Sequence, residues 1–284
     1  MHVRKLTESL GAEITGVELL ALLEPANLPA LSAAWARYGV LVFPKQVVSD
    51  AEQIQFARAF GTLTVFSSAA GKSGTEINHA SNLDTAGHLF APDDERSRLL
   101  AINAYWHIDG CYRSQPNKGS VLRAVVIPDH GGEPVFANLA ASYTALPKRI
   151  QQGLNTVYCR HSFAHMLRQC DMTSLAPGDP KTLPAQDHPL VWKHRNGRRS
   201  LFLSPPYMEQ IRGLTYAQTQ WVVEWLVRWA TQRKFVYMHR WRHGDVILWD
   251  NRWTMHKVAS YDLASMPRVM HGVVLVGDAT VEPP

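Results

Sequence analysis

The pattern of apolar and polar positions predicts helices in the first 60 residues and short strands from residue 100 onward. Residues 40–43 are all apolar, which is typical of a buried strand, and residues 28–37 before them have the periodicity of a helix. Ser49 and Glu52 have the spacing of a capping box and predict a second helix. Helices that flank many short strands indicate an α+β fold built on a β-sandwich or barrel.

Two stretches, 62–104 and 165–190, lack this periodicity and are predicted as loop segments, the first as a lid over a functional site. Asn138 is expected to cap a helix, which Pro147 interrupts. Further strands are expected at residues 106–109, 121–127, 190–194, 200–203, 235–241, 246–249 and 269–276.

Thr215 and Gln218 form another capping box ahead of a tryptophan-rich helix. Trp221, Trp225 and Trp229 follow at four-residue spacing and form one stripe along this helix. Large apolar side chains at this spacing are typical of a face that packs on a core. We therefore predict a core-packing role for the stripe, rather than a ligand stack.

Composition and charge exclude several functional classes. The net charge is +5, and the arginines near Asn196-Gly197, a hairpin signal, predict a solvated turn rather than a nucleic-acid surface. No apolar run approaches the ~20 residues that span a bilayer, so no membrane segment is expected. Three cysteines without paired spacing and the lack of a secretory signal favour a reduced, cytoplasmic protein. The arginines of this turn are Arg195, Arg198 and Arg199.

The candidate chemistry lies at Trp106-His107-Ile108-Asp109 and at His256. On a strand, His107 and Asp109 would share one face about 7 Å apart, where they can bind one metal ion with His256 as the third ligand. Two histidines and one carboxylate leave open positions on a six-coordinate ion, an arrangement that suits Fe(II) oxygenases. The triplet alone is also typical of a hydrogen-bonded core histidine, and zinc hydrolases use the same ligand types.

Nine blocks of sequence, in order along nearly the whole chain, resemble the TauD/TfdA family of Fe(II)- and 2-oxoglutarate-dependent dioxygenases. This resemblance implies a double-stranded β-helix, or jelly-roll, core in a single dioxygenase domain over residues 1–284. It also implies Fe(II), 2-oxoglutarate and O2 as cofactors and co-substrates. The blocks are 11–17, 39–43, 56–61, 81–84, 106–109, 131–133, 249–252, His256 and 267–271.

The resemblance also implies roles for individual residues. His107, Asp109 and His256 match the iron ligands at the catalytic centre. Arg268 matches the arginine that binds the distal carboxylate of 2-oxoglutarate, a role that suits a planar guanidinium because it pairs bidentately with carboxylates. Asn103 matches an asparagine that lines the substrate or co-substrate pocket.

Two positions depart from the family pattern. Pro134 replaces a threonine whose hydroxyl contacts the same co-substrate carboxylate, and proline has neither hydroxyl nor N–H. Gly272 replaces the arginine that binds the anionic group of taurine or aryloxyacetate substrates. Gly110, Cys111 and Tyr112, just after the ligand segment, are further candidates for the substrate pocket, which is expected to be roomier and less cationic.

The expected function is therefore hydroxylation, desaturation or cyclisation at an unactivated carbon of a small molecule, with release of succinate and CO2. The substrate is expected to be larger or less anionic than taurine, such as a secondary-metabolite intermediate. One alternative is an aryloxyalkanoate or sulfonate dioxygenase with another anion-binding residue, for which Arg113 and Arg160 are candidates. A second alternative, favoured by Pro134, is a degenerate, non-catalytic member. The resemblance also implies self-association into a homo-oligomer.

Overall fold

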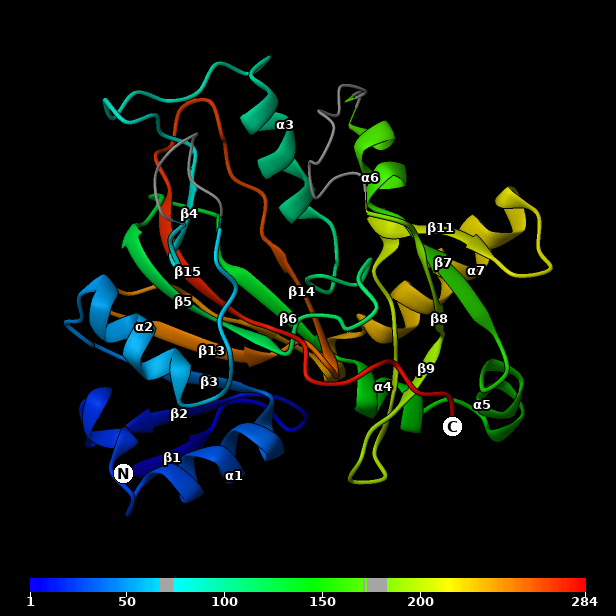
Figure 1. Cartoon of the computed structure of the whole chain (residues 1–284), viewed down its shortest axis with the longest axis horizontal. Coiled ribbons are helices and arrows are strands. Elements are labelled where there is room, and N and C mark those ends of the chain that lie inside the picture. Colours follow the sequence, from blue (N-terminus) through cyan, green and yellow to red (C-terminus); the bar gives the residue numbers. More distant parts are fainter. Residues whose placement is uncertain (67–73, 171, 173–182) are drawn as a thin grey trace.

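The computed structural model describes residues 1–66, 74–170, 172 and 183–284 (Figure 1). Its largest element is a seven-stranded sheet in which neighbouring strands are antiparallel, except for the parallel pair β2–β3. In spatial order the strands are β1 (His2–Lys5), β2 (Ala12–Thr15), β3 (Val40–Phe43), β13 (Val246–Asp250), β5 (Gly119–Val126), β15 (Val269–Leu275) and β4 (Asn78–Ser81).

Helices cover one face of this sheet, which we call the outer face. They are η1 (Leu20–Leu23), α1 (Leu28–Tyr38) and α2 (Asp50–Arg58). Leu31 of α1 and Phe56 of α2 are fully buried against the apolar side chains of the sheet. The capping box at Ser49 is confirmed, since Ser49 Oγ accepts the N–H of Glu52 and the Glu52 carboxylate accepts the N–H of Ser49. The predicted strand at 40–43 is confirmed as well.

A three-stranded sheet packs against the opposite, inner face. It consists of β12 (Val236–Met238), β6 (Pro134–Asn138) and β14 (Thr254–Val258). The ring of Phe136 on β6 lies 5.7 Å from that of Trp249 on β13, within a buried cluster that includes Val42 and Ile247. Two sheets with a shared apolar interior and helices outside form an α+β sandwich, as predicted. Strands β6 and β14 were not expected, because both are short and directly follow turns.

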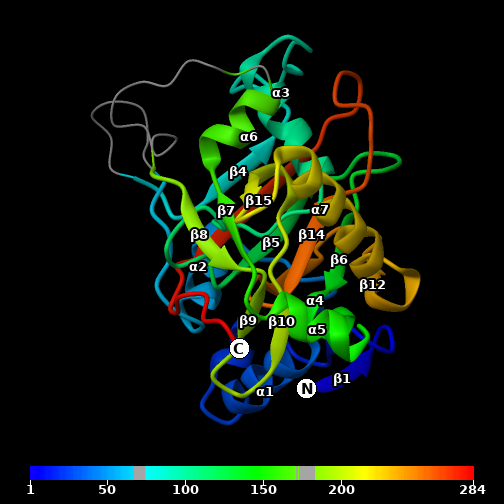
Figure 2. The ribbon, with the colours of Figure 1, turned by 90° about the vertical axis from the view of Figure 1, so that its right-hand side faces the viewer.

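The remaining elements pack around a second core beside the sandwich (Figure 2). No helix in the described ranges is long and apolar enough to cross a membrane. The strands are β7 (Tyr158–His161), β8 (Gln186–Pro189), β9 (Val191–Lys193), β10 (Arg199–Leu201) and β11 (Met208–Ile211). The helices are α4 (Leu139–Thr144), α5 (Lys148–Leu154), α6 (Phe163–Gln169), η4 (Pro205–Tyr207), α7 (Tyr216–Ala230) and η5 (Arg233–Phe235).

Both segments predicted as loops contain regular structure. Residues 62–104 include β4 at the edge of the large sheet, α3 (Glu95–Ala101) and η2 (Ile102–Ala104). Residues 165–190 include most of α6 and all of β8. Sequence periodicity missed these elements because each is only three to seven residues long. The parts of the two predictions at 67–73, 171 and 173–182 lie outside the described residues.

Two of the three tryptophans in the stripe of α7, Trp225 and Trp229, pack against the second core as predicted. The buried side chains of the helix are Thr219, Val223, Leu226 and Ala230. Trp221 is 64% exposed, so the core-packing prediction is wrong for this residue. Trp225 and Trp229 are partly buried and stack on each other with ring centres 6.2 Å apart. The capping box that opens this helix is confirmed.

Candidate metal and co-substrate site

Two histidines and one aspartate meet where the segment after η2 crosses β14. His107 and His256 form an isolated bridge in which the N–H of each donates to the carbonyl of the other at 2.9 Å. Asp109 lies in the turn that follows, so the predicted strand over 106–109 is wrong and extended pairing is limited to the bridge. The Asp109 carboxylate turns back to the imidazoles, with Oδ1 3.7 Å from Nε2 of His107 and Oδ2 3.8 Å from Nε2 of His256.

The orientation of the two imidazoles suits a metal. Nδ1 of His107 lies 2.8 Å from the carbonyl oxygen of Tyr105, which only accepts, so Nδ1 donates this hydrogen bond and Nε2 is the nitrogen that faces Asp109. Burial, and then the nearby His107, lower the pKa of His256 to about 3, so this ring is neutral at physiological pH. The donor atoms of the three residues all lie within 4.8 Å of one another. Two imidazoles and a carboxylate at this spacing fit Fe(II) with open positions.

Arg268 is buried without a carboxylate partner among the described residues. It is 4% exposed, and its Nε donates to the carbonyl of Gly132 at 3.2 Å. Its guanidinium lies 5.8 Å from the ring centre of Tyr261. Arg268 and Asn103, both predicted site residues, line one cavity of about 100 Å³. Because a buried cation without a counter-ion is costly, a ligand carboxylate at this place would be strongly favoured.

The turn before β6 forms one wall beside this arginine. Gly131 and Gly132 have φ of 75° and 73°, a backbone region that favours glycine. A Cβ on Gly132 would lie only 3.2 Å from Cδ of Arg268, so a side chain there would displace the guanidinium. Pro134 begins β6 opposite Val258 and offers no hydrogen-bond donor. The hydroxyl of the family's threonine at this position therefore has no counterpart in the Pro134 side chain.

The four candidates for the substrate pocket lie in different surroundings. Gly110 has a φ of 68°, and a Cβ there would lie 2.7 Å from Oδ1 of Asn117, so this glycine serves a tight turn. Cys111 is fully buried in an apolar cluster, and burial raises the pKa of its thiol. Neither residue lines open space. Tyr112 packs its ring against Phe163 at 4.7 Å, in an aromatic group that also contains Tyr207.

Gly272 lies on the inner face of β15, the face that also carries the His–Asp–His cluster. A Cβ on this glycine would lie 3.4 Å from Cδ1 of Leu122, and Leu122 packs in the cluster of Phe136 and Trp249. Those two rings contact His256, at centre distances of 6.1 and 5.0 Å. A Cβ at position 272 would therefore be in ordinary van der Waals contact with its neighbours and would point into the sandwich.

Three polar residues were assigned no role from the sequence although they support the predicted ones. Asn251 and Ser120 donate to Oδ2 of Asp109 at 3.3 and 3.4 Å. Asn82 accepts the backbone N–H of Arg268 at 2.7 Å and so fixes the start of β15. Both asparagines lie within the sequence blocks that carry the family resemblance. Their presence in those blocks was the only available signal, because spacing along the chain does not reveal a partner far away in sequence.

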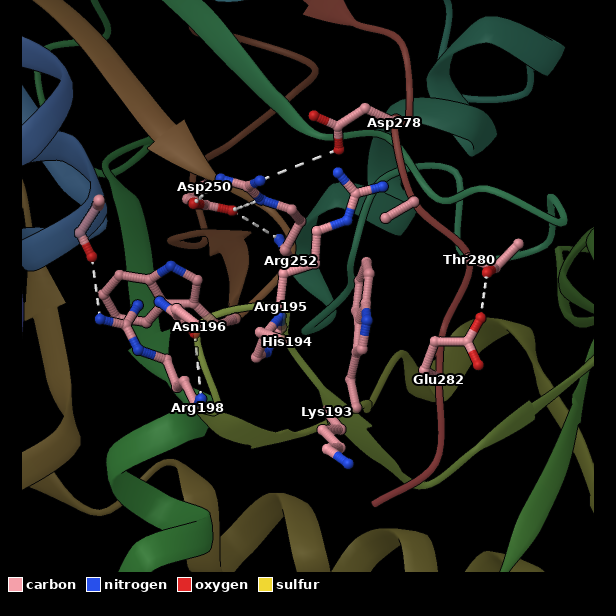
Figure 3. A pocket seen from close by; sticks show the side chains of 14 residues that line it. Lys193, His194, Arg195, Asn196, Arg198, Asp250, Arg252, Asp278, Thr280 and Glu282 are labelled. Atoms are coloured by element: carbon pink, nitrogen blue, oxygen red, sulfur yellow. Dashed lines mark hydrogen bonds and ion pairs between the residues drawn. The ribbon is translucent and has the colours of Figure 1, made fainter.

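A second cavity, of about 370 Å³, lies between the β9–β10 hairpin and residues 278–282 (Figure 3). Half of its lining residues are charged, and none of the His–Asp–His residues lines it. Arg252 pairs with Asp250 through two hydrogen bonds of 2.8 and 2.7 Å. A weaker contact of 3.9 Å joins Arg252 to Asp278. These pairs neutralise much of the charge within the cavity.

The hairpin arginines differ in their environments. Arg195 and Arg199 are exposed, in agreement with the predicted solvated turn. Arg198 is not: its guanidinium lies 4.2 Å from the ring centre of Trp253 and donates to the carbonyl of Ala36 at 3.0 Å. The solvated-turn prediction is therefore wrong for this side chain, whose planar group stacks on an aromatic face.

A sandwich that holds two histidines, one carboxylate and a buried arginine without a carboxylate partner among the described residues defines the class of non-haem iron oxygenases that use a 2-oxo acid. Residues 2–274 match the family described as "Taurine catabolism dioxygenase TauD, TfdA family". The chain belongs to this family, and its core is the family's jelly roll. It is a 2-oxoglutarate-dependent dioxygenase that uses Fe(II), 2-oxoglutarate and O2.

Individual relatives agree with this assignment. The (S)-phenoxypropionate/alpha-ketoglutarate-dioxygenase of Delftia acidovorans is 33% identical, over 96% of this chain and 94% of that protein. The alpha-ketoglutarate-dependent 2,4-dichlorophenoxyacetate dioxygenase of Cupriavidus pinatubonensis is 29% identical, over 95% and 96%. The crystal structure of AAD-2 with Mn(II) and N-oxalylglycine has a TM-score of 0.88 at 29% identity, and covers 99% of this chain and 100% of that one.

Proposed function

We propose that His107, Asp109 and His256 hold the iron and that Arg268 binds the distal carboxylate of 2-oxoglutarate, with Asn103 in the same pocket. One observation carries this proposal: Val258, two residues beyond His256 on β14, lines the cavity that contains Arg268. Side chains two apart on a strand share a face. A molecule with carboxylates at both ends can therefore extend from the iron ligands to the buried guanidinium.

The bound iron, with 2-oxoglutarate and O2, supplies the oxidising chemistry, while the protein orients the reactants and excludes water. His107 is oriented by Tyr105, and the rings of Phe136 and Trp249 cover His256. The reaction proposed for this chain is hydroxylation of an unactivated carbon, with succinate and CO2 as co-products. Desaturation and cyclisation would use the same residues.

The proposed substrate is a small molecule that is larger or less anionic than taurine, such as a secondary-metabolite intermediate. Support comes from Gly272, which places no positive charge beside Leu122 on the inner face of β15, where an arginine would supply one. An anion that entered such a pocket would lose hydration without gaining a paired charge. The aromatic group of Tyr112, Phe163 and Tyr207 favours a substrate with an apolar or aromatic body.

The test is succinate production with a panel of substrates: taurine, 2,4-dichlorophenoxyacetate, (S)-2-phenoxypropionate and an uncharged aryl ether. We expect the wild type to turn over the uncharged compound in preference to taurine and 2,4-dichlorophenoxyacetate. The Gly272→Arg variant should gain activity on the two acids. Efficient turnover of either acid by the wild type would show that Gly272 does not set the substrate charge.

A second candidate substrate is an aryloxyalkanoic acid bound through another cation. The relatives at 33% and 29% identity act on such acids, and this observation favours the candidate. Arg113 is exposed beside Tyr112 and pairs with no carboxylate of the described residues, whereas Arg160 contacts Glu209 at 3.6 Å. If the wild type accepts (S)-2-phenoxypropionate, Arg113→Ala should raise the KM for this acid and leave the KM for an uncharged substrate unchanged.

Two further predictions from the sequence remain proposals. Residues 1–284 are proposed to fold as one domain, which limited proteolysis would test by yielding no stable fragment. Self-association is proposed as well. Sedimentation velocity would measure it directly, and a monomer at micromolar concentration would contradict it.

A further inference from the structure

The carboxylate of Asp109 is hydrogen-bonded by side chains of two other segments. Asn251 Nδ2 and Ser120 Oγ both donate to the same oxygen, Oδ2, at 3.3 and 3.4 Å. Each carboxylate oxygen lies near one imidazole, Oδ1 3.7 Å from Nε2 of His107 and Oδ2 3.8 Å from Nε2 of His256, but among the described residues only Oδ2 accepts a hydrogen bond. We propose that Asn251 is a positioning residue that holds Oδ2 and leaves Oδ1 for the iron. This inference rests on the iron site proposed above.

The orientation of the Asn251 amide follows from its other partner. The amide oxygen accepts a hydrogen bond of 2.9 Å from the indole Nε1 of Trp249. An indole N–H only donates, so the amide oxygen must face Trp249 and the NH2 group must face Asp109. Asn251 is fully buried, so water does not compete for either bond. Trp249 thus fixes the direction in which Asn251 donates.

The backbone around Asn251 is braced on both sides. Asp250 accepts the N–H and the guanidinium of Arg252, a pair visible at the edge of the second cavity (Figure 3). The Thr254 hydroxyl donates to the Asp250 carbonyl at 2.7 Å. The N–H of Asn251 itself donates to the carbonyl of Lys118 at 3.1 Å. These bonds fix the turn, so the amide nitrogen is presented to Asp109 from a rigid position.

Holding one carboxylate oxygen matters for the coordination number. An aspartate that binds through both oxygens occupies two positions on the metal, whereas the family's chemistry needs open positions for 2-oxoglutarate and O2. Hydrogen bonds to Oδ2 satisfy that oxygen within the protein and favour binding through Oδ1 alone. Loss of such an outer partner typically lowers metal affinity or activity about 10–100-fold.

The experiment is an anaerobic Fe(II) titration of the full-length protein, followed by the visible charge-transfer band of the Fe(II)–2-oxoglutarate complex. Asn251→Ala should weaken Fe(II) binding about 10–100-fold and shift the band. Trp249→Phe, which frees the amide to rotate, should cause a smaller change of the same kind. Trp241→Phe is the matched control, because the Trp241 indole N–H is buried and has no partner among the described residues, so no change is expected.

The outcomes separate this inference from the proposed site. Wild-type affinity and an unshifted band in Asn251→Ala would overturn the role of Asn251. If Asn251→Ala unfolds, the test is the difference in Fe(II) affinity and band position between Trp249→Phe and Trp241→Phe. Equal values for these two variants would overturn the role of Asn251 as well. Failure of the wild type to bind Fe(II), or retention of binding in His107→Ala, would contradict the iron site itself.

Discussion

Two clusters of two histidines and one aspartate lie on opposite faces of the seven-stranded sheet. In each, one donor atom from every residue lies within 4.8 Å of the others. The inner cluster is His107, Asp109 and His256, and the outer cluster is Asp50, His79 and His271. By residue type and spacing alone, both clusters are candidate metal sites. Their geometries, however, differ.

The imidazole planes differ first. The rings of His107 and His256 are tilted by 49° at a centre distance of 4.2 Å. The rings of His79 and His271 are stacked, with an interplanar angle of 22° at 4.3 Å. Because a nitrogen lone pair lies in the plane of its ring, nearly parallel rings direct their lone pairs side by side rather than toward one point. The outer pair is therefore poorly arranged to share an ion.

The partners of the carboxylates differ as well. Oδ1 of Asp50 accepts a hydrogen bond of 2.7 Å from Nδ1 of His271 and pairs with the guanidinium of Arg123. A guanidinium thus takes the place that a metal ion would need. Asp109 contacts no arginine or lysine of the described residues and is held instead by neutral donors. Ring orientation and the partner of the carboxylate, rather than residue type, distinguish the two clusters.

The largest expected effect comes from removing a ligand of the inner cluster. His107→Ala or His256→Ala should abolish turnover. Either variant should also lower iron affinity by more than the loss of a residue that hydrogen-bonds a metal ligand, which lowers it about 10–100-fold. His79→Ala and His271→Ala are matched controls and should keep wild-type iron content. Iron content after dialysis reports the iron affinity, and succinate output reports the turnover. Comparable iron loss in the outer variants would remove the distinction between the clusters.

The next effect concerns the two arginines. Arg268→Ala would leave the co-substrate carboxylate without its proposed buried partner, which costs about 3–5 kcal/mol and should raise the Kd of 2-oxoglutarate by about two to four orders of magnitude. Arg123→Ala, at the outer cluster, should leave this Kd unchanged. Anaerobic calorimetric titration with 2-oxoglutarate separates the two. Equal binding by Arg268→Ala and the wild type would show that the co-substrate lies elsewhere.

A smaller effect is expected at Pro134. Pro134→Thr restores a hydroxyl and an N–H beside the Arg268 pocket and should tighten 2-oxoglutarate binding about 2–10-fold, the worth of one net hydrogen bond. The same titration measures it. An unchanged Kd would mean that another group already fills this role. Tyr261, whose pKa burial raises and the neighbouring Arg268 lowers, is the group in contact with the guanidinium.

The smallest effect is on stability at the outer cluster. Burial alone would raise the pKa of Asp50, but the hydrogen bond and charge of His271 and the charge of Arg123 lower it below its usual value. A carboxyl group with a depressed folded-state pKa adds stability above its unfolded pKa and loses this contribution as the pH falls through the folded one. Asp50 is partly exposed, so Asp50→Asn should cost at most about 1 kcal/mol at pH 7.

Chemical denaturation at several pH values checks this expectation. The difference between Asp50→Asn and the wild type should shrink as the pH falls below about 4, near the ordinary pKa of an aspartate. Iron binding should not change in this variant. A destabilisation that is independent of pH would show that the Asp50 ion pairs add nothing to stability.

The sequence was most informative where local rules suffice. The capping boxes at Ser49 and Thr215 depend on residues three apart, and both occur as expected. The proposed site residues were selected through ordered blocks of sequence rather than through the predicted strand at 106–109, which is a bridge and a turn. The turn still brings Asp109 to the imidazoles, so the three residues meet although the predicted strand is wrong.

Other features depend on contacts that no local pattern encodes. Asn251 acts on Asp109 and Asn82 on Arg268 across more than 100 positions of the chain. The exposure of Trp221 depends on which side of α7 faces the second core, and that side is set by the buried positions Thr219, Val223, Leu226 and Ala230. The substrate is harder still to predict, because pocket shape depends on side chains from several segments.

The bridge between His107 and His256 has a consequence for how the protein unfolds. The two residues are about 150 positions apart in the chain, and only one reciprocal pair of backbone hydrogen bonds joins them directly. An ion bound by both side chains would cross-link the two residues and close a very long loop. The entropy of such a closure changes only slowly with loop length. Strands β5 and β13 lie within this loop and pair with β15 and β3 outside it, so the bridge is one of several contacts that hold the loop. Bound iron would add a further constraint that slows the unfolding of this part of the chain.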